Sequence, residues 1–187
     1  KSILNFLGLK NISKDILNSE ELRMAVVDSK SVLSKNYQNM LLNIIDLEKV
    51  KVDDIMIPHH ELVSADINNE EDLFEQLKRI QHTRLLIFDG SENNIIGTIH
   101  MRDVVNIYAK DEINVSKIKE IIREPYFIPE GTPLSQQLEH FKNQKRRLGI
   151  VVDEYGEVKG MVVLDDILEE IVGQFTSSQG ESINEMN

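Results

Sequence analysis

Apolar positions follow two different spacings along this chain, and the spacings predict helices near the start and strands further on. Over residues 19–47 apolar side chains recur at helical intervals, which predicts amphipathic helices with a break near residues 34–36. Apolar and polar positions alternate over residues 95–99, and residues 149–152 form an apolar run, as expected of strands. The apolar stripe of the N-terminal helices is typical of a packing surface rather than of a cofactor site.

A short pattern with glycine at one end and aspartate at the other occurs twice. It runs from Gly97 to Asp103 and again from Gly160 to Asp166, and the same offset of 63 residues separates both pairs. A fixed period of this size indicates a duplicated supersecondary unit. Each unit is predicted to contain a strand, a helix, two strands and another helix, so we expect a mixed α/β (α+β) fold in which the two repeats pack against each other.

The repeat also predicts the domain organisation. Four segments are expected: a helical linker at residues 1–50, a first repeat at 51–113, a second repeat at 114–175 and a flexible tail at 176–187. Residues 153–156 are predicted to form the hairpin turn of the second repeat. The equivalent connection in the first repeat, residues 89–94, is expected to be longer and more polar.

Composition then excludes several classes of function. The 187 residues include no cysteine, which excludes disulfides, thiol catalysis and thiolate metal sites. The net charge of −11 disfavours nucleic acid and anionic lipid, because most of the surface would repel their phosphates. No apolar run approaches the roughly 20 residues of a membrane span. Because the chain begins at Lys1 rather than at Met, we expect it to be a piece of a longer protein.

The repeated pattern places a carboxylate in the first turn of a helix, just after a strand that contains glycine. Without a Cβ, Gly97 and Gly160 allow a neighbouring backbone or a ligand to come close. A carboxylate at such a place accepts hydrogen bonds from ribose hydroxyls, which favours a nucleoside over a bare phosphate. The alternative is that Asp103 and Asp166 only cap their helices, which stabilises a helix by about 1 kcal/mol.

The chain resembles the tandem cystathionine-β-synthase (CBS) domain pair of the CorC/HlyC and CNNM-type magnesium and cobalt transport proteins. The blocks that carry the resemblance are residues 53–58 (DDIMIP), 82–84 (HTR), 97–103 (GTIHMRD), 151–156 (VVDEYG) and 165–173 (DDILEEIVG). The last two blocks are quite specific to this subfamily, and the resemblance extends over about residues 1–175. It implies two CBS repeats of β-α-β-β-α order, packed with pseudo-two-fold symmetry behind N-terminal helices.

The resemblance further implies a regulatory module that is not an enzyme. A membrane domain would precede residues 1–50 and hold the module at the cytoplasmic face of the cell membrane, and two copies would form a homodimer. AMP, ADP or ATP would bind between the repeats, with Mg²⁺ arriving on ATP. One motif set supplies the candidates Thr83, Arg84, His100 and Asp103, the other Ile150, Val163 and Asp166, and Ile57, Pro58 and Ile128 are added from the strands that precede them.

Three functions stay open at this point. The first is the nucleotide sensor, and the second is a structural dimerisation domain whose pocket has lost its ligand. Val163 and Ile57 motivate the second, because each lacks a hydroxyl that the family's motif carries. The third is a phosphohydrolase that uses the acids of residues 165–170.

Other charged residues leave alternatives of their own. Arg84 either meets phosphates or forms a surface ion pair, and the basic residues at 142–147 either bind phosphate or complement the dipole of the preceding helix. No dedicated metal site is expected, because none of the five histidines forms an i, i+4 pair.

Overall fold

The computed structural model describes residues 19–28, 33–79, 83–109 and 114–173, which belong to two compact units. One unit ends at Asp46 and the other begins at Leu47. The predictions made for residues 1–18 and for the tail at 176–187 lie outside the described residues. None of the described helices combines the length and the apolar character needed to cross a bilayer.

The described part of the first unit contains two helices, α2 (Ser19–Asp28) and α3 (Lys35–Asp46). The side-chain amide of Gln38 donates hydrogen bonds of 2.8 and 3.0 Å to the backbone carbonyls of Val26 and Val27. Arg23 in α2 also forms an ion pair with Asp46 in α3. These contacts fix α2 against α3. The helical prediction is therefore confirmed for the described residues of this region. The predicted break at residues 34–36 is too late by two residues, because Lys35 and Asn36 already belong to α3.

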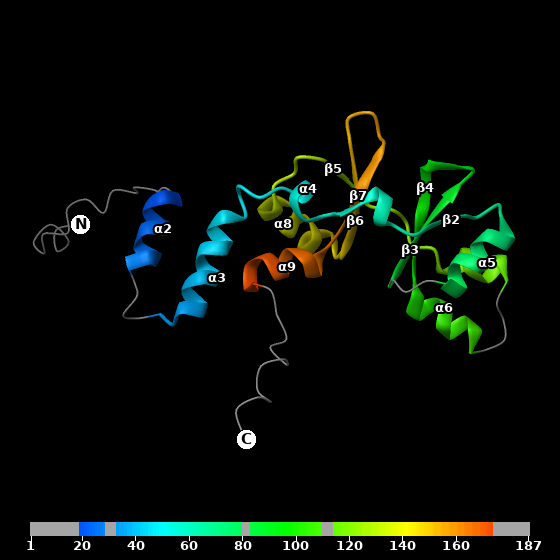
Figure 1. The fold of residues 1–187 in the computed structure, drawn as a ribbon, viewed down its shortest axis with the longest axis horizontal. Coiled ribbons are helices and arrows are strands. Elements are labelled where there is room, and N and C mark those ends of the chain that lie inside the picture. Colours follow the sequence, from blue (N-terminus) through cyan, green and yellow to red (C-terminus); the bar gives the residue numbers. More distant parts are fainter. Residues whose placement is uncertain (1–18, 29–32, 80–82, 110–113, 174–187) are drawn as a thin grey trace, which may run out of the picture. The chain divides into compact units, whose positions relative to one another are not determined.

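The second unit contains two copies of one arrangement (Figure 1). The first copy consists of β2 (Ser64–Asp66), α5 (Glu70–Arg79), β3 (Arg84–Asp89), β4 (Ser91–His100) and α6 (Met101–Tyr108). The second consists of β5 (Phe127–Pro129), α8 (Leu134–Gln144), β6 (Leu148–Val152), β7 (Val158–Val163) and α9 (Leu164–Val172). In both copies the first strand pairs parallel with the second, and the second pairs antiparallel with the third. The predicted β-α-β-β-α order is confirmed.

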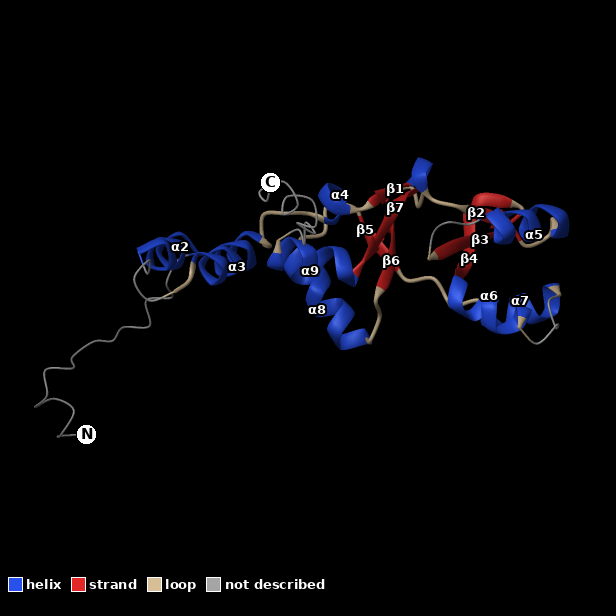
Figure 2. Ribbon diagram, turned by 60° about the horizontal axis from the view of Figure 1, so that its bottom comes forward, coloured by secondary structure: helices blue, strands red, loops and turns tan. Residues whose placement is uncertain are grey.

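From here on, repeat means one of these two five-element copies, and the segment just ahead of each copy is exchanged with the other. Strand β1 (Ile57–Pro58) comes before the first repeat but pairs antiparallel with β7 of the second. Reciprocally, Arg123 comes before the second repeat but forms two backbone hydrogen bonds, of 2.9 and 3.0 Å, with Thr98 in β4 of the first. One sheet therefore has the order β1-β7-β6-β5 and the other β2-β3-β4 (Figure 2).

Two short helices follow the same exchange. Helix α4 (Val52–Ile55) buries Val52 in the core of the second repeat, where the amide of Val52 donates to the carbonyl of Thr132 at 2.9 Å. Helix α7 (Val115–Ile121) buries Ile118 in the core of the first repeat. Each repeat thus completes its hydrophobic core with a helix that lies, in sequence, ahead of the other repeat.

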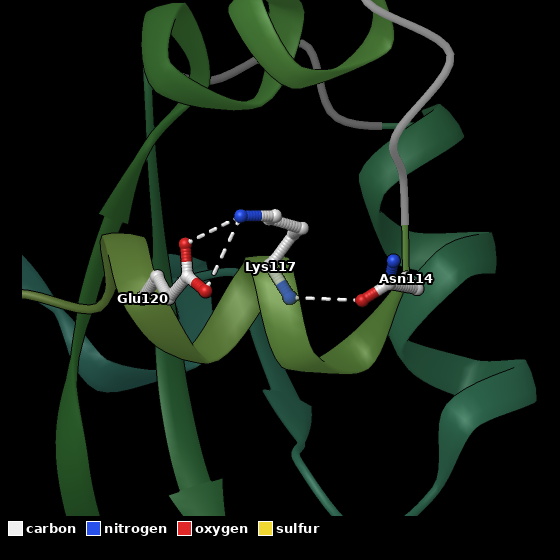
Figure 3. Close-up of polar contacts among 3 residues, drawn as sticks. All are labelled: Asn114, Lys117 and Glu120. Atoms are coloured by element: carbon white, nitrogen blue, oxygen red, sulfur yellow. Dashed lines mark hydrogen bonds and ion pairs between the residues drawn. The ribbon is translucent and has the colours of Figure 1, made fainter.

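Helix α7 has well-defined polar contacts at its start (Figure 3). Asn114 is its N-cap, and the side-chain oxygen of Asn114 accepts a hydrogen bond of 3.0 Å from the backbone amide of Lys117. The ammonium of Lys117 in turn donates to both carboxylate oxygens of Glu120, at 3.0 and 3.3 Å. Since a capped helix has fewer unsatisfied amides, these contacts help to fix the place where α7 enters the first repeat.

A third hydrophobic cluster joins the two sheets. It contains Leu86 and Ile95 from the first repeat and Ile150 and Val158 from the second. Leu86 and Ile150 occupy equivalent positions of the two repeats, as do Ile95 and Val158. Equal contributions from both sides are what a pseudo-two-fold relation between the repeats requires.

The two hairpins differ, and one prediction needs correction. In the second repeat the carboxylate of Asp153 accepts hydrogen bonds of 2.9 Å from the amides of Tyr155 and Glu157, which confirms the predicted turn. In the first repeat the expected long connection at residues 89–94 is wrong, because β3 and β4 are separated only by Gly90, whose φ is +71°. Polar side chains suggested a loop, but both faces of this strand end are exposed and tolerate them.

The glycines of the repeated pattern stand where the exchanged segments cross the sheets. A Cβ on Gly160 would lie 2.4 Å from the carbonyl oxygen of Ile57, and one on Gly97 would lie 2.4 Å from that of Arg123. Of the two partners that the sequence allowed, a backbone or a ligand, the structure places a backbone beside each glycine. The repeated glycine therefore serves the fold.

We expect Gly160→Ala to lower the free energy of unfolding by about 3 kcal/mol, because the new methyl group would overlap the backbone of β1. Gly131→Ala is the matched control. Gly131 has a φ of +74° and no described atom within 4 Å of an added Cβ, so only about 1–2 kcal/mol of backbone strain is expected. Urea unfolding measures both values, and equal losses would contradict the tight crossing of β1 and β7.

Candidate functional site

Two clefts lie within the second unit, and residues of both repeats line each of them. The first cleft has a volume of about 330 Å³ and the second about 540 Å³. Both volumes are in the range of small-molecule sites. Three side chains line both clefts: Arg84, His100 and Asp165.

The first cleft has an apolar wall. Five aliphatic side chains line it: Ile57, Leu62, Val63, Met161 and Val163. Ile57 and Met161 are partners in the pairing of β1 with β7, so the exchange of segments builds this wall. A flat, weakly polar ring would find apolar surface here, because the hydrophobic effect favours burial of its faces.

Asp166 is the main acid of the first cleft. It lies in the first turn of α9, and its Oδ2 accepts a hydrogen bond of 3.2 Å from the amide of Val163. The capping alternative is therefore realised with one oxygen, whereas Oδ1 makes no hydrogen bond with any described residue. Burial raises the pKa of Asp166, and the neighbouring charges of Asp165 and Glu169 raise it further. A ligand that donates hydrogen bonds to Asp166 would therefore stabilise its ionised carboxylate.

Arg84, the first residue of β3, is the main cation of the first cleft, and it too is partly buried. Burial lowers the pKa of its guanidinium, and the positive charges of Arg123 and Arg147 lower it further. Arg84 forms neither an ion pair nor a side-chain hydrogen bond within the described part of the chain. A half-buried guanidinium without an ion pair or a hydrogen bond is well suited to bind an anion. Charge-assisted hydrogen bonds from the anion would replace the hydration that the guanidinium loses on burial.

His100 lies between the two clefts. It is the N-cap of α6, and its Nδ1 accepts a hydrogen bond of 3.1 Å from the amide of Arg102. Burial lowers the pKa of His100, and the charges of Arg84 and Arg102 lower it further. The ring is therefore neutral near pH 7, with its remaining proton on Nε2.

The second cleft is rich in positive charge, and we call it the basic cleft. Its basic side chains are Arg84, Arg102, Arg123, Lys145, Arg146 and Arg147. Its acids are Asp103, Glu124 and Asp165, and each forms an ion pair there: Arg123 with Asp103 at 2.7 Å, Arg146 with Glu124 at 3.8 Å and Arg147 with Asp165 at 3.1 Å. Three basic groups remain in excess, in a chain whose net charge is −11.

The predicted residues are distributed unequally between the clefts. Six of them line the first cleft: Ile57, Thr83, Arg84, His100, Val163 and Asp166. Asp103 lines the basic cleft instead, where it pairs with Arg123. Pro58 lies in β1 but lines neither cleft, and Ile128 and Ile150 are core residues that are 1% and 0% exposed. The two motif sets are mixed, because Thr83 and Arg84 of the first repeat share a cleft with Asp166 of the second.

Sequence reasoning missed two of the basic residues. Arg102 lies inside the repeated pattern itself and was visible there, but nothing in the pattern indicated its charge as important. Arg123 reaches the basic cleft only through the exchange of segments, which no local pattern reveals. Lys145, Arg146 and Arg147 line the basic cleft, whereas Lys142, from the same basic cluster, does not.

The described residues contain no group of three or more histidines and acids placed to hold a metal ion. The acids at the start of α9 complement the helix dipole, and Asp165 is additionally paired with Arg147. Their arrangement supports neither a built metal site nor an activated water.

Comparison with known proteins adds to this geometry. Residues 52–110 and 115–173 each match the family model described as CBS domain. The UPF0053 inner membrane protein YfjD of Escherichia coli is 38% identical over 189 residues, which cover 99% of this chain and 44% of that protein. The chain thus spans less than half the length of this relative.

Two solved structures with bound nucleotides are similar to the chain. The CBS-domain pair with bound AMP from Klebsiella pneumoniae is 40% identical, with a TM-score of 0.62 over 66% of this chain and 99% of that one. The CBS domain of the bacterial CNNM/CorC family Mg²⁺ transporter in complex with ATP is 30% identical, with a TM-score of 0.66 over 74% of this chain and 98% of that one. The chain therefore belongs to the CBS-domain family, as a tandem pair of the kind found in CNNM/CorC magnesium transporters.

Proposed function

We propose that this chain is a regulatory module that binds an adenine nucleotide in the first cleft and thereby controls a divalent-cation transporter for Mg²⁺ or Co²⁺. The observation that carries the proposal is a pair of partly buried, incompletely satisfied charges in that cleft. Burial disfavours the charged forms of both Arg84 and Asp166, and an apolar wall lies beside them. Perturbed charges of opposite sign in one cleft are typical of functional sites.

A nucleotide satisfies each of these groups with a different part. The base would lie against the apolar wall, the ribose diol would donate to Asp166, and the phosphates would accept from Arg84 and the nearby hydroxyl of Thr83. Val163 offers no hydroxyl, so the diol contact depends on Asp166. The nucleotides bound to the two similar structures, AMP and ATP, support an adenine ligand, with Mg²⁺ arriving on ATP.

The proposed role is regulation by binding, not catalysis. In the similar inner membrane protein the remaining length would hold the membrane domain, and by analogy this module lies at the cytoplasmic face of the membrane. A nucleotide that contacts both repeats favours the arrangement in which all its contacts coexist, and helices α2 and α3 would transmit this shift. Steady release of phosphate from ATP would instead support the phosphohydrolase alternative that uses the acids of α9.

The second candidate is a structural module whose pocket no longer binds a nucleotide. One feature favours it: Ile57 and Val163 present aliphatic side chains to the first cleft, where hydroxyls would have contacted a ligand. The two candidates differ in a simple property, because only the sensor gains stability from nucleotide.

Thermal unfolding with AMP, ADP, ATP and GTP tests the sensor directly. A ligand that binds only the folded chain at 100 times its Kd stabilises it by about 2.7 kcal/mol, so we expect the Tm to rise with adenine nucleotides and not with GTP.

Asp166→Asn should weaken ATP binding about tenfold or more, since hydrogen bonds to a charged acceptor contribute about 1.5–3 kcal/mol.

The 2′-deoxynucleotide supplies the control for this assignment. The unmodified chain should prefer ATP over 2′-deoxy-ATP, and the Asp166→Asn variant should lose most of that preference. Without ligand the variant should be as stable as the original chain, because Asn keeps an acceptor for the amide of Val163 and removes a poorly solvated charge. Equal discrimination by both proteins would contradict the role of Asp166.

His100 makes binding depend on pH. Burial and the neighbouring cations lower the pKa of His100 and keep the ring neutral near pH 7, and a bound phosphate would raise this pKa by adding negative charge. Nucleotide affinity should therefore increase as pH falls from 8 towards 6, with net proton uptake on binding. Calorimetry in buffers of different ionisation enthalpy measures the uptake. In His100→Gln the uptake should disappear, and an unchanged uptake would exclude His100 as its source.

We also propose that two copies of this module form a homodimer through α6 and α9. Equivalent positions on these helices, Val105 and Leu168, are 59% and 41% exposed, and Tyr108 and Val172 beside them are 45% and 37% exposed. Matching apolar faces on two related helices fit a second copy that packs on both.

The double variant Val105→Asp/Leu168→Asp tests this interface. Sedimentation should show a monomer, since burying two carboxylates without partners would oppose association. Asn106→Asp adds a charge at another exposed position of α6 and should leave the dimer intact. A monomeric original chain, or a dimer that survives both aspartates, would contradict the proposed interface.

A further inference from the structure

We propose that the first cleft and the basic cleft bind phosphate anions antagonistically, because both depend on the same arginine. This inference rests on the proposed nucleotide site and adds a rule for its regulation. The shared residue is Arg84, which lines both clefts and has no partner among the described residues. A compact phosphate anion such as pyrophosphate is the ligand expected in the basic cleft.

The charge balance of the first cleft makes Arg84 indispensable there. Among the described residues that line this cleft, Glu61, Asp165 and Asp166 are acids, and Arg84 is the one permanent cation. His100 adds no charge near pH 7. If Arg84 turns towards an anion in the basic cleft, the phosphates of a nucleotide face three carboxylates and no guanidinium.

The basic cleft has its own means to hold an anion. Arg102 and Lys145 line only this cleft, and their side chains have no ion pair with the described residues. Together with Arg84 they provide three cations that form no ion pair with a described carboxylate. Phosphate oxygens would accept hydrogen bonds from all three, as charge-assisted contacts of this kind are strong.

The ion pair between Asp165 and Arg147 is a second source of antagonism between the clefts. Asp165 lines both clefts and pairs with Arg147, which lines only the basic cleft. An anion in the basic cleft would compete with Asp165 for Arg147 and leave the carboxylate unpaired beside the first cleft. The added negative charge there would repel a nucleotide further, so both shared residues produce antagonism.

Calorimetric titration of the chain with ATP at increasing pyrophosphate tests the proposal. The free Mg²⁺ concentration and the ionic strength are held constant at every pyrophosphate concentration, which excludes effects of metal sequestration and of salt. We expect pyrophosphate to raise the Kd for ATP about tenfold and then to reach a plateau, as coupling between two sites requires. Direct competition for one site would instead raise the apparent Kd without limit.

Matched variants locate the effect. Arg102→Gln/Lys145→Gln removes two cations that line only the basic cleft and should abolish the response to pyrophosphate. Lys142→Gln removes a nearby exposed cation that lines neither cleft and should keep the response.

The outcomes separate this inference from the function on which it rests. ATP binding that pyrophosphate leaves unchanged would overturn the antagonism and leave the nucleotide site standing. A rise in Kd without a plateau, equal in Arg102→Gln/Lys145→Gln, would mean simple competition in the first cleft and would also overturn it. Absence of ATP binding in the original chain without pyrophosphate would overturn the nucleotide site itself, and the antagonism with it.

Discussion

The reciprocal backbone pairing across the two repeats is the constraint on which the rest of this structure depends. Strand β1 pairs with β7, and Arg123 forms an isolated bridge with Thr98, so each sheet is hydrogen-bonded to chain from ahead of the other repeat. The glycines at 97 and 160 allow these crossings, because any side chain there would meet a carbonyl oxygen. The crossings also carry Ile57 into the first cleft and Arg123 into the basic cleft. Fold and site therefore arise from one feature.

The duplication created two related clefts, and side-chain differences gave them different chemistry. Ile57 and Arg123 occupy equivalent places in the two crossings, yet one is apolar and the other charged. Asp103 is consequently paired with Arg123, whereas the equivalent Asp166 lies in a cleft with an apolar wall and keeps an oxygen available. One cleft suits a nucleoside, and the other suits an anion.

The charges in these clefts are poorly compensated, and this has a physical meaning. Burying Arg84 and Asp166 without full partners lowers the stability of the folded chain, since burial disfavours the charged form of each. The three hydrophobic clusters of the second unit can offset that loss. Local rules are most often broken at functional sites, and here the broken rules lie together in the clefts and not in the core.

Much of the fold could be predicted from sequence, because its signals are local. The spacing of apolar residues and the 63-residue period predicted the helices, the strands and their order, and the turn at Asp153 followed from residue types that favour turns. The strand at residues 91–94 was missed, since polar side chains on an exposed strand resemble a loop. Of these residues only Ser91 has a partner in β3, and the register shifts between Ser91 and Ile95, an irregularity that local composition does not encode.

The sequence by itself determined the duplication, the carboxylates in the first turns of α6 and α9, and the candidates Thr83, Arg84, Val163 and Asp166. Only the tertiary structure decided that these four share a cleft, that Asp103 is neutralised by Arg123, and that Ile128 and Ile150 belong to the core. The physical reason is the exchange of segments, which brings together residues far apart in the chain. Its energy comes from backbone pairing and buried surface between the repeats, and neither leaves a signal in any short stretch of sequence.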